Sequence, residues 1–139
     1  MLDLITFSKP NVVPKGWGRE IQIANVEGGL TFPCGYSGKL LIYDKAGSIS
    51  SMHFHTKKHE TFYVLSGSFL LNYYNPVTAE RLTQPLNVGE MVRIPVNNPH
   101  QLQCLQAGTI IEFATTDYDW DNFRVGQGDS QRLKSLENE

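Results

Sequence analysis

The chain has 139 residues, with 12 Lys and Arg against 14 Asp and Glu and therefore a formal net charge of −2. This length predicts one domain with its own core, and the near-neutral charge gives no sign of a nucleic-acid groove or a basic membrane patch. The first ten residues do not read as a signal peptide, and no stretch is long enough to cross a bilayer. We therefore expect a cytoplasmic protein whose partners include neither nucleic acid nor a membrane.

Short apolar runs separated by Gly, Pro, Asn, Asp and Ser follow one another along the chain, which is typical of an all-β sandwich or barrel. No helical period appears before residue 129, and the polar tail Asp129–Glu139 is expected to form a short helix or to fray. In chain order, the predicted strands are Glu20–Asn25, Lys39–Tyr43, Ile49–His55, Glu60–Leu65, Ser68–Tyr74, Glu80–Leu82, Met91–Ile94, His100–Cys104 and Ile110–Thr115.

Two histidines one residue apart end the third predicted strand. Because side chains alternate along a strand, His53 and His55 point to the same face. Glu60 follows after a short polar turn and opens the next strand, and His100 opens a later one. Imidazole and carboxylate ligands together suit a divalent transition metal, so these residues predict one bound ion. The residues alone leave Zn, Mn, Fe and Ni open as its identity.

Two spaced motifs now resemble those of the cupin superfamily. The segment Gly47–Gly67 matches the first cupin motif, G-x5-H-x-H-x4-E-x6-G, at every position. The segment Gly89–Cys104 resembles the second motif, G-x5-P-x-G-x2-H-x3-N, with Asn97 in place of a glycine and Cys104 in place of the final asparagine. Asparagine tolerates the left-handed backbone that a turn glycine supplies, so the departure at Asn97 is mild.

The resemblance implies an all-β fold formed by a single cupin barrel, a jelly-roll-like double-stranded β-helix, over residues 1–139. Within it we expect N-terminal edge strands in residues 1–36, the core barrel in residues 37–116 and a C-terminal segment in residues 117–139. Cupins of this size commonly pair their sheets, so a homodimer is expected. The apolar strand faces that we expect a second copy to cover lie around Met52, Phe54, Leu71 and Tyr73.

Shorter segments resemble the mannose-6-phosphate isomerase type II-like group and other sugar-isomerase cupins. They are Lys15–Glu20, with the letters KGWGRE, then Ser37–Leu40, Ile111–Phe113, and the acidic-plus-arginine pattern of Asp121 and Arg124. This resemblance implies a metal-dependent isomerase that acts on a sugar, a sugar phosphate or another small oxygen-rich ligand.

Such an isomerase needs a base close to the metal, and the sequence offers several. Lys58 completes an H-x-H-x2-K-x-E pattern found in some sugar-isomerase cupins, and Glu112 lies in the last predicted strand of the barrel. We take Lys58 and Glu112 as the catalytic candidates, while Tyr63 and His59 remain open as alternatives. Candidates for contacts to a phosphate or carboxylate are Arg93 and Arg124.

Three functions fit these residues at this point. The first is the sugar or sugar-phosphate isomerase. The second is a metal-dependent dioxygenase, because the same four ligands serve Fe(II) with O2 in an open position. The third is a non-catalytic cupin that only binds a sugar-like small molecule.

Overall fold

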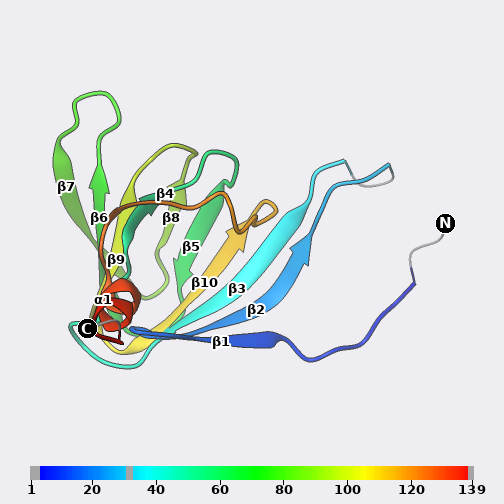
Figure 1. The fold of residues 1–139 in the computed structure, drawn as a ribbon, viewed down its shortest axis with the longest axis horizontal. Coiled ribbons are helices and arrows are strands. Elements are labelled where there is room, and N and C mark those ends of the chain that lie inside the picture. Colours follow the sequence, from blue (N-terminus) through cyan, green and yellow to red (C-terminus); the bar gives the residue numbers. More distant parts are fainter. Residues whose placement is uncertain (1–3, 31–32, 138–139) are drawn as a thin grey trace.

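The computed structural model describes residues 4–30 and 33–137, which fold into two antiparallel sheets that face each other (Figure 1). The parts of the expected N-terminal segment and tail that fall in residues 1–3, 31–32 and 138–139 lie outside the described residues. Strands carry nearly all the regular structure, and the one described helix is α1 (Asp129–Glu137). The all-β barrel expected from the sequence is confirmed.

One sheet has six strands and the other has five. The six-stranded sheet runs in the order β1 (Asn11–Lys15), β2 (Gly18–Val26), β3 (Tyr36–Tyr43), β10 (Gly108–Ala114), β5 (Glu60–Val64) and β8 (Met91–Ile94). The five-stranded sheet runs in the order β11 (Phe123–Gly126), β4 (Met52–Phe54), β9 (His100–Gln106), β6 (Ser68–Tyr74) and β7 (Arg81–Asn87).

The differences from the predicted strands have local causes. Strands β1 and β11 are absent from the prediction, and β7 extends well beyond the predicted Glu80–Leu82. Pro14 in β1 and Pro85 in β7 argue against strands in a sequence-based prediction. Both strands lie at sheet edges, however, where proline's missing N–H need not remove a hydrogen bond between strands. Strand β4 is shorter than predicted because only Ile49 of the preceding residues makes a bridge, to Gln103.

The barrel interior divides into two ends. Leu41, Ile110 and Val64 are cross-strand neighbours on β3, β10 and β5, and they belong to one apolar cluster, here called the apolar end. Two residues further along the same strands, the inward positions hold Lys39 on β3 and Glu112 on β10, and this region is here called the charged end. The apolar end comprises Trp17, Leu41, Tyr43, Phe62, Val64, Phe69, Leu71, Leu86, Ile94, Leu102, Cys104 and Ile110.

The apolar faces for which we expected a second copy as cover are covered within the chain itself. Leu71 belongs to the apolar end, and Tyr73 packs against it. Met52 is buried where β4 pairs with β11, and Phe54 stacks on Phe123 of that strand with 5.3 Å between ring centroids. Within the chain, Leu71 and Tyr73 therefore pack into the barrel and Met52 and Phe54 pack beside β11, so these side chains do not require a second copy, and the homodimer itself stays a prediction.

The tail ends in helix α1, whose first residue docks onto the barrel. The backbone N–H of Ile49 donates to Asp129 Oδ2 over 2.8 Å, and the N–H of Asp129 donates back to the carbonyl of Ile49 over 2.9 Å. Among the residues that the structure describes, no helix combines the length and the apolar character needed to span a bilayer.

Candidate metal centre

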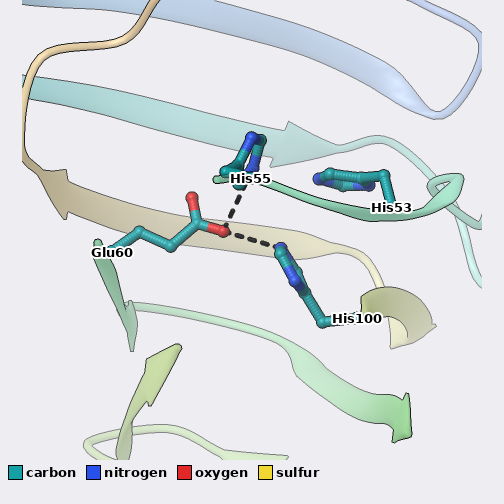
Figure 2. A group of neighbouring side chains, drawn as sticks. All are labelled: His53, His55, Glu60 and His100. Atoms are coloured by element: carbon teal, nitrogen blue, oxygen red, sulfur yellow. Dashed lines mark ion pairs between the residues drawn. The ribbon is translucent and has the colours of Figure 1, made fainter. Parts of the chain in front are cut away.

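Four ligand-type side chains converge at the charged end (Figure 2). His53 lies on β4, His55 follows the end of that strand, and Glu60 and His100 are the first residues of β5 and β9. His53 and His100 are cross-strand partners, and one potential ligand atom from each of the four residues lies within 4.8 Å of all the others. The structure therefore brings together the complete set of residues that the sequence predicted as ligands.

Hydrogen bonds to the backbone set the tautomer of each imidazole. His55 Nδ1 lies 2.6 Å from the carbonyl oxygen of Asp121, and His100 Nδ1 lies 2.9 Å from that of Asn98. His53 Nδ1 lies 2.9 Å from the carbonyl oxygen of Ser51. A carbonyl can only accept, so each Nδ1 carries the proton. In the neutral imidazole, the lone pair is therefore on Nε2, as metal ligation requires.

The inward atoms are close to one another but poorly satisfied. His100 Nε2 lies 2.6 Å from Glu60 Oε1 and His55 Nε2 lies 3.5 Å from the same oxygen (Figure 2). These three atoms are buried, yet none makes a hydrogen bond of acceptable geometry. Buried polar atoms without partners are costly. A cation held among them would remove that cost, and the imidazole and carboxylate donors suit a divalent transition metal.

The protonation states of His53 and Glu60 also agree with a role as metal ligands. Burial, helped by the neighbouring His100, holds the pKa of His53 well below its ordinary value, so this imidazole is neutral. Burial alone would raise the pKa of Glu60, but the neighbouring His100, the close contact with His55 and the charge of Lys58 outweigh burial and lower that pKa strongly. The site thus presents a neutral imidazole and an ionised carboxylate, which are the forms that bind metals.

The charged end continues from Glu60 through a chain of ion pairs. Lys58 Nζ lies 3.2 Å from Glu60 Oε2, 3.4 Å from Glu112 Oε2 and 3.5 Å from Asp117 Oδ1. Lys39 Nζ lies 2.5 Å from Asp117 Oδ2 and 2.9 Å from Glu20 Oε1. Both lysines are almost fully buried. The catalytic candidates Lys58 and Glu112 therefore contact each other, and Lys58 also contacts a predicted metal ligand.

Glu112 is unusual among these carboxylates. Burial raises its pKa, the nearby Glu60 carboxylate raises it further, and Lys58 and Lys39 only partly oppose this, so that the pKa of Glu112 is about 7. A carboxyl group with a pKa near neutrality can both accept and return a proton.

Asp121 anchors the loop between His55 and Glu60. Its fully buried carboxylate accepts hydrogen bonds from the N–H and hydroxyl of Thr56, over 2.6 and 2.7 Å, and from the N–H groups of Lys57 and Lys58, both over 3.0 Å. Its backbone carbonyl accepts the bond from His55 described above. One residue of the C-terminal segment thus positions both a predicted ligand and the loop that carries Lys58.

A cavity of about 420 Å³ opens onto this region. Its lining includes three of the four predicted ligands, His53, His55 and His100, and both catalytic candidates, Lys58 and Glu112. The other lining residues are mainly polar and include an aromatic pair, in which Trp17 stacks on Tyr43 at 4.3 Å between ring centroids. The volume and the polar lining suit a small ligand with many oxygen atoms.

Of the remaining candidate residues, some line the cavity and others lie outside it. Tyr63 lies on the outer face of β5, and His59 is exposed, so neither lines the cavity. Arg93 is exposed on β8 outside the cavity, whereas Arg124 lines it, directly opposite His53 in the pairing of β11 with β4.

Sequence reasoning missed several residues of the charged end. Lys39 had a signal, since it is the one ionisable group of its strand apart from the tyrosines, whereas Glu20 lies in a strand with several other polar residues. Asp117 and Asp121 lie in a loop, where no periodicity reveals the direction of a side chain. The departure at Asn97 fits its position, because Asn97 adopts a left-handed φ of 63°.

Comparison with known proteins agrees with this architecture. The model of the cupin domain family matches residues 40–110, which is half of the chain and includes all four predicted ligands. The chain belongs to the cupin family. No curated protein matches it.

Solved structures support the same cupin fold. The capsular polysaccharide assembling protein CapF from Staphylococcus aureus aligns with a TM-score of 0.72 and 18% identity, over 86% of this chain and 32% of its own. Oxalate decarboxylase from Bacillus subtilis aligns with a TM-score of 0.70 and 18% identity, over 87% of this chain and 31% of its own. This cupin thus spans about a third of the length of either protein, and at such identity the likeness shows the fold alone.

Proposed function

We propose that this cupin binds one divalent transition metal through His53, His55, Glu60 and His100 and uses it to isomerise a small sugar or sugar phosphate. The observation that carries the proposal is the buried Lys58–Glu112 pair, which opens onto the same polar cavity as the imidazoles. A site that only binds a ligand has no need for an acid–base pair, 3.4 Å apart, beside its metal ligands.

An aldose–ketose isomerisation moves one proton between neighbouring carbons and one between their oxygens, so atoms and electrons balance without a co-reactant. The bound ion would supply Lewis-acid chemistry, which polarises a carbonyl oxygen. Glu112 takes the proton from one carbon and returns it to the next. Lys58 holds the Glu112 carboxylate in place through their ion pair, and its positive charge offsets the charges of Glu60 and Glu112 beside the ligand. The polar cavity lining binds the remaining hydroxyl groups.

The cupin neighbours are compatible with this proposal at the level of fold. CapF is named for capsular polysaccharide assembly, which concerns sugar chemistry. Oxalate decarboxylase of B. subtilis is described with Mn(II) centres, which keeps Mn among the candidate ions beside Zn, Fe and Ni. Both are analogies from distant relatives, and the argument for this chain rests on its own residues.

The test is solvent deuterium exchange at C1 or C2 of a panel of aldoses, ketoses and their phosphates, followed by NMR with metal-loaded protein. We expect exchange with at least one member. Lys58→Met and Glu112→Gln should each slow it by roughly 10²- to 10⁴-fold with metal content retained. The matched control is Lys57→Met, whose side chain lies outside the cavity over Trp120 and which should leave the rate unchanged.

The same assay can refute the isomerase proposal. Absence of exchange across the panel at full metal occupancy would remove the isomerase. Oxygen uptake with a small substrate would then favour the dioxygenase, and saturable binding of a sugar without turnover would favour the non-catalytic cupin.

A further inference from the structure

Four basic residues line the polar cavity, and they differ in how their charges are balanced. Lys39 and Lys58 are almost fully buried, and each lies in ion pairs with carboxylates of the charged end. The other two are Lys15 on β1 and Arg124 on β11. Because the charges of Lys39 and Lys58 are already compensated within the fold, the positive charge that is available to a ligand comes from Lys15 and Arg124.

The guanidinium of Arg124 has no ion-pair or hydrogen-bond partner among the groups that the structure describes. Arg124 is the cross-strand partner of His53, so the two side chains leave neighbouring strands on the same face, with Cβ atoms about 5 Å apart. Both residues line the cavity. A planar and permanently charged group without a protein partner therefore lies beside a predicted metal ligand.

Lys15 lines the same cavity from the other sheet. Strand β1 is an edge of the six-stranded sheet, whereas β11 is an edge of the five-stranded sheet. Lys15 is half-buried and forms no ion pair within the described part of the chain. Ser130 of α1 also lines the cavity, and its hydroxyl accepts a hydrogen bond from the N–H of Gly16 over 3.0 Å, which leaves the hydroxyl proton for a ligand. Both sheets and the helix thus offer donors to one space.

The charge of the cavity lining favours a negatively charged ligand. The acidic residues in the lining equal the basic ones in number, and they are Glu20, Glu112, Asp117 and Asp119. Burial raises the pKa of Glu112 to about 7, so this group is only partly ionised at neutral pH. Glu60 adds one negative charge beside the cavity, but a divalent ion would add two positive charges. The metal-loaded site therefore carries a net positive charge, which a neutral sugar leaves uncompensated.

We propose that Arg124, assisted by Lys15, binds a phosphate group of the ligand and thereby selects a phosphorylated sugar over a neutral one. The inference rests on the proposed function and narrows its ligand class. The guanidinium presents paired N–H groups in one plane, which match two oxygens of a phosphate monoester. A phosphate also brings enough negative charge to balance the metal-loaded site. The cavity of about 420 Å³ lies within the range of sites that bind small molecules, so a sugar and its phosphate can share it.

The test is isothermal titration of the metal-loaded protein with hexoses and their phosphates. The wild-type protein should bind at least one hexose phosphate at least ten times more tightly than the parent hexose, and this preference should shrink as salt is added. Arg124→Met should lower the affinity for that hexose phosphate about ten- to hundredfold and leave the affinity for the hexose unchanged. Lys15→Met should lower it less, by about threefold, because a single ammonium lacks the paired geometry.

The matched control is Arg93→Met, because Arg93 is an exposed arginine outside the cavity. Elemental analysis of each variant shows that the metal is retained. If Arg124→Met does not fold or does not hold metal, Arg124→Lys serves in its place. It keeps the charge but loses the planar fork, and it should still weaken binding of the hexose phosphate relative to Arg93→Met.

Two results would overturn the inference. One is a wild-type protein that binds every hexose phosphate no more tightly than its parent hexose. The other is an Arg124 variant that binds the hexose phosphate as tightly as Arg93→Met does. The isomerase proposal fails separately. Deuterium exchange in a neutral sugar without a phosphate preference removes the phosphate site alone, whereas a phosphate preference that depends on Arg124 but brings no exchange removes the isomerase alone.

Discussion

The two ends of the barrel interior lie on the same strands but contain opposite chemistry. Along β3, the inward residues change from Tyr43 and Leu41 to Lys39, and along β10 they change from Ile110 to Glu112. The apolar end gains stability from burial alone. The charged end holds buried ions whose desolvation is costly unless each one is paired. Burial at the apolar end thus stabilises the fold and thereby permits a costly site at the charged end.

The largest effect is expected where the charged end meets the predicted metal. Replacement of His53 and His55 together by Ala should reduce bound metal from one equivalent to none, because two of the four ligands are lost. Elemental analysis after loading with Zn, Mn, Fe(II) or Ni measures this. His59→Ala is the control, since His59 is an exposed histidine outside the cavity. Full metal retention by the double variant would contradict the assignment.

Lys39→Met should show the cost of an unpaired charge. The variant leaves Glu20 without its ion-pair partner and Asp117 with Lys58 alone, and loss of one partner of a buried pair costs about 3–5 kcal/mol of unfolding free energy. Urea unfolding measures the loss, and exposed Lys45→Met is the matched control. Equal stability of the two variants would show that the ion pairs of the charged end are not needed for folding.

Ile110→Ala tests the apolar end by itself. Ile110 is fully buried and lies outside the cavity lining, so its truncation should cost about 2–5 kcal/mol through lost burial and the void left behind. Metal bound per folded molecule should stay the same. A loss of metal affinity in the folded variant would mean that the two ends are not separable.

Asp121→Asn should moderately reduce both the stability of the fold and the affinity for metal. The amide group cannot accept all the hydrogen bonds that the carboxylate accepts from the loop of residues 56–58, so the loss should be about 1–3 kcal/mol of unfolding free energy. Metal affinity should fall about 10- to 100-fold, because the loop that the Asp121 carboxylate anchors joins the ligands His55 and Glu60. Isothermal titration with the chosen metal measures the second effect. The control is Asp119→Asn, two residues before Asp121 and exposed, which should change neither the unfolding free energy nor the metal affinity appreciably.

The smallest expected effect is the contribution of Glu20 to the pH dependence of stability. Burial would raise the pKa of Glu20, but the charge and hydrogen bond of Lys39 outweigh it, so the pKa lies below the ordinary value of 4.5. The folded state therefore binds fewer protons than the unfolded state in this range, and stability present above pH 4.5 declines as the pH falls through the lowered pKa. Glu20→Gln should reduce the difference in bound protons by at most about one. Urea unfolding between pH 3 and pH 6 tests this, with exposed Glu80→Gln as the control, and an unchanged slope would contradict it.

The sequence predicted the parts of the molecule that depend on local pattern. Alternation predicted most strands, and the spacing of His53, His55, Glu60 and His100 predicted that these residues meet. Strand β11 and the anchoring role of Asp121 were not predictable in this way, because both depend on where an irregular C-terminal segment crosses the barrel. The same limit applies to the apolar side chains of Met52, Phe54, Leu71 and Tyr73, since an alternating strand has two faces and only tertiary structure decides which one is buried.

The orientation of the three imidazoles has a consequence for how such a site can change. Each ring is held by a main-chain carbonyl, at Ser51, Asn98 and Asp121, and a carbonyl persists whatever side chain its residue carries. Mutations that reshape the cavity therefore leave the rings aimed as before. A designer, or natural variation, can alter ligand preference at this centre while keeping the ion-binding geometry as a constant.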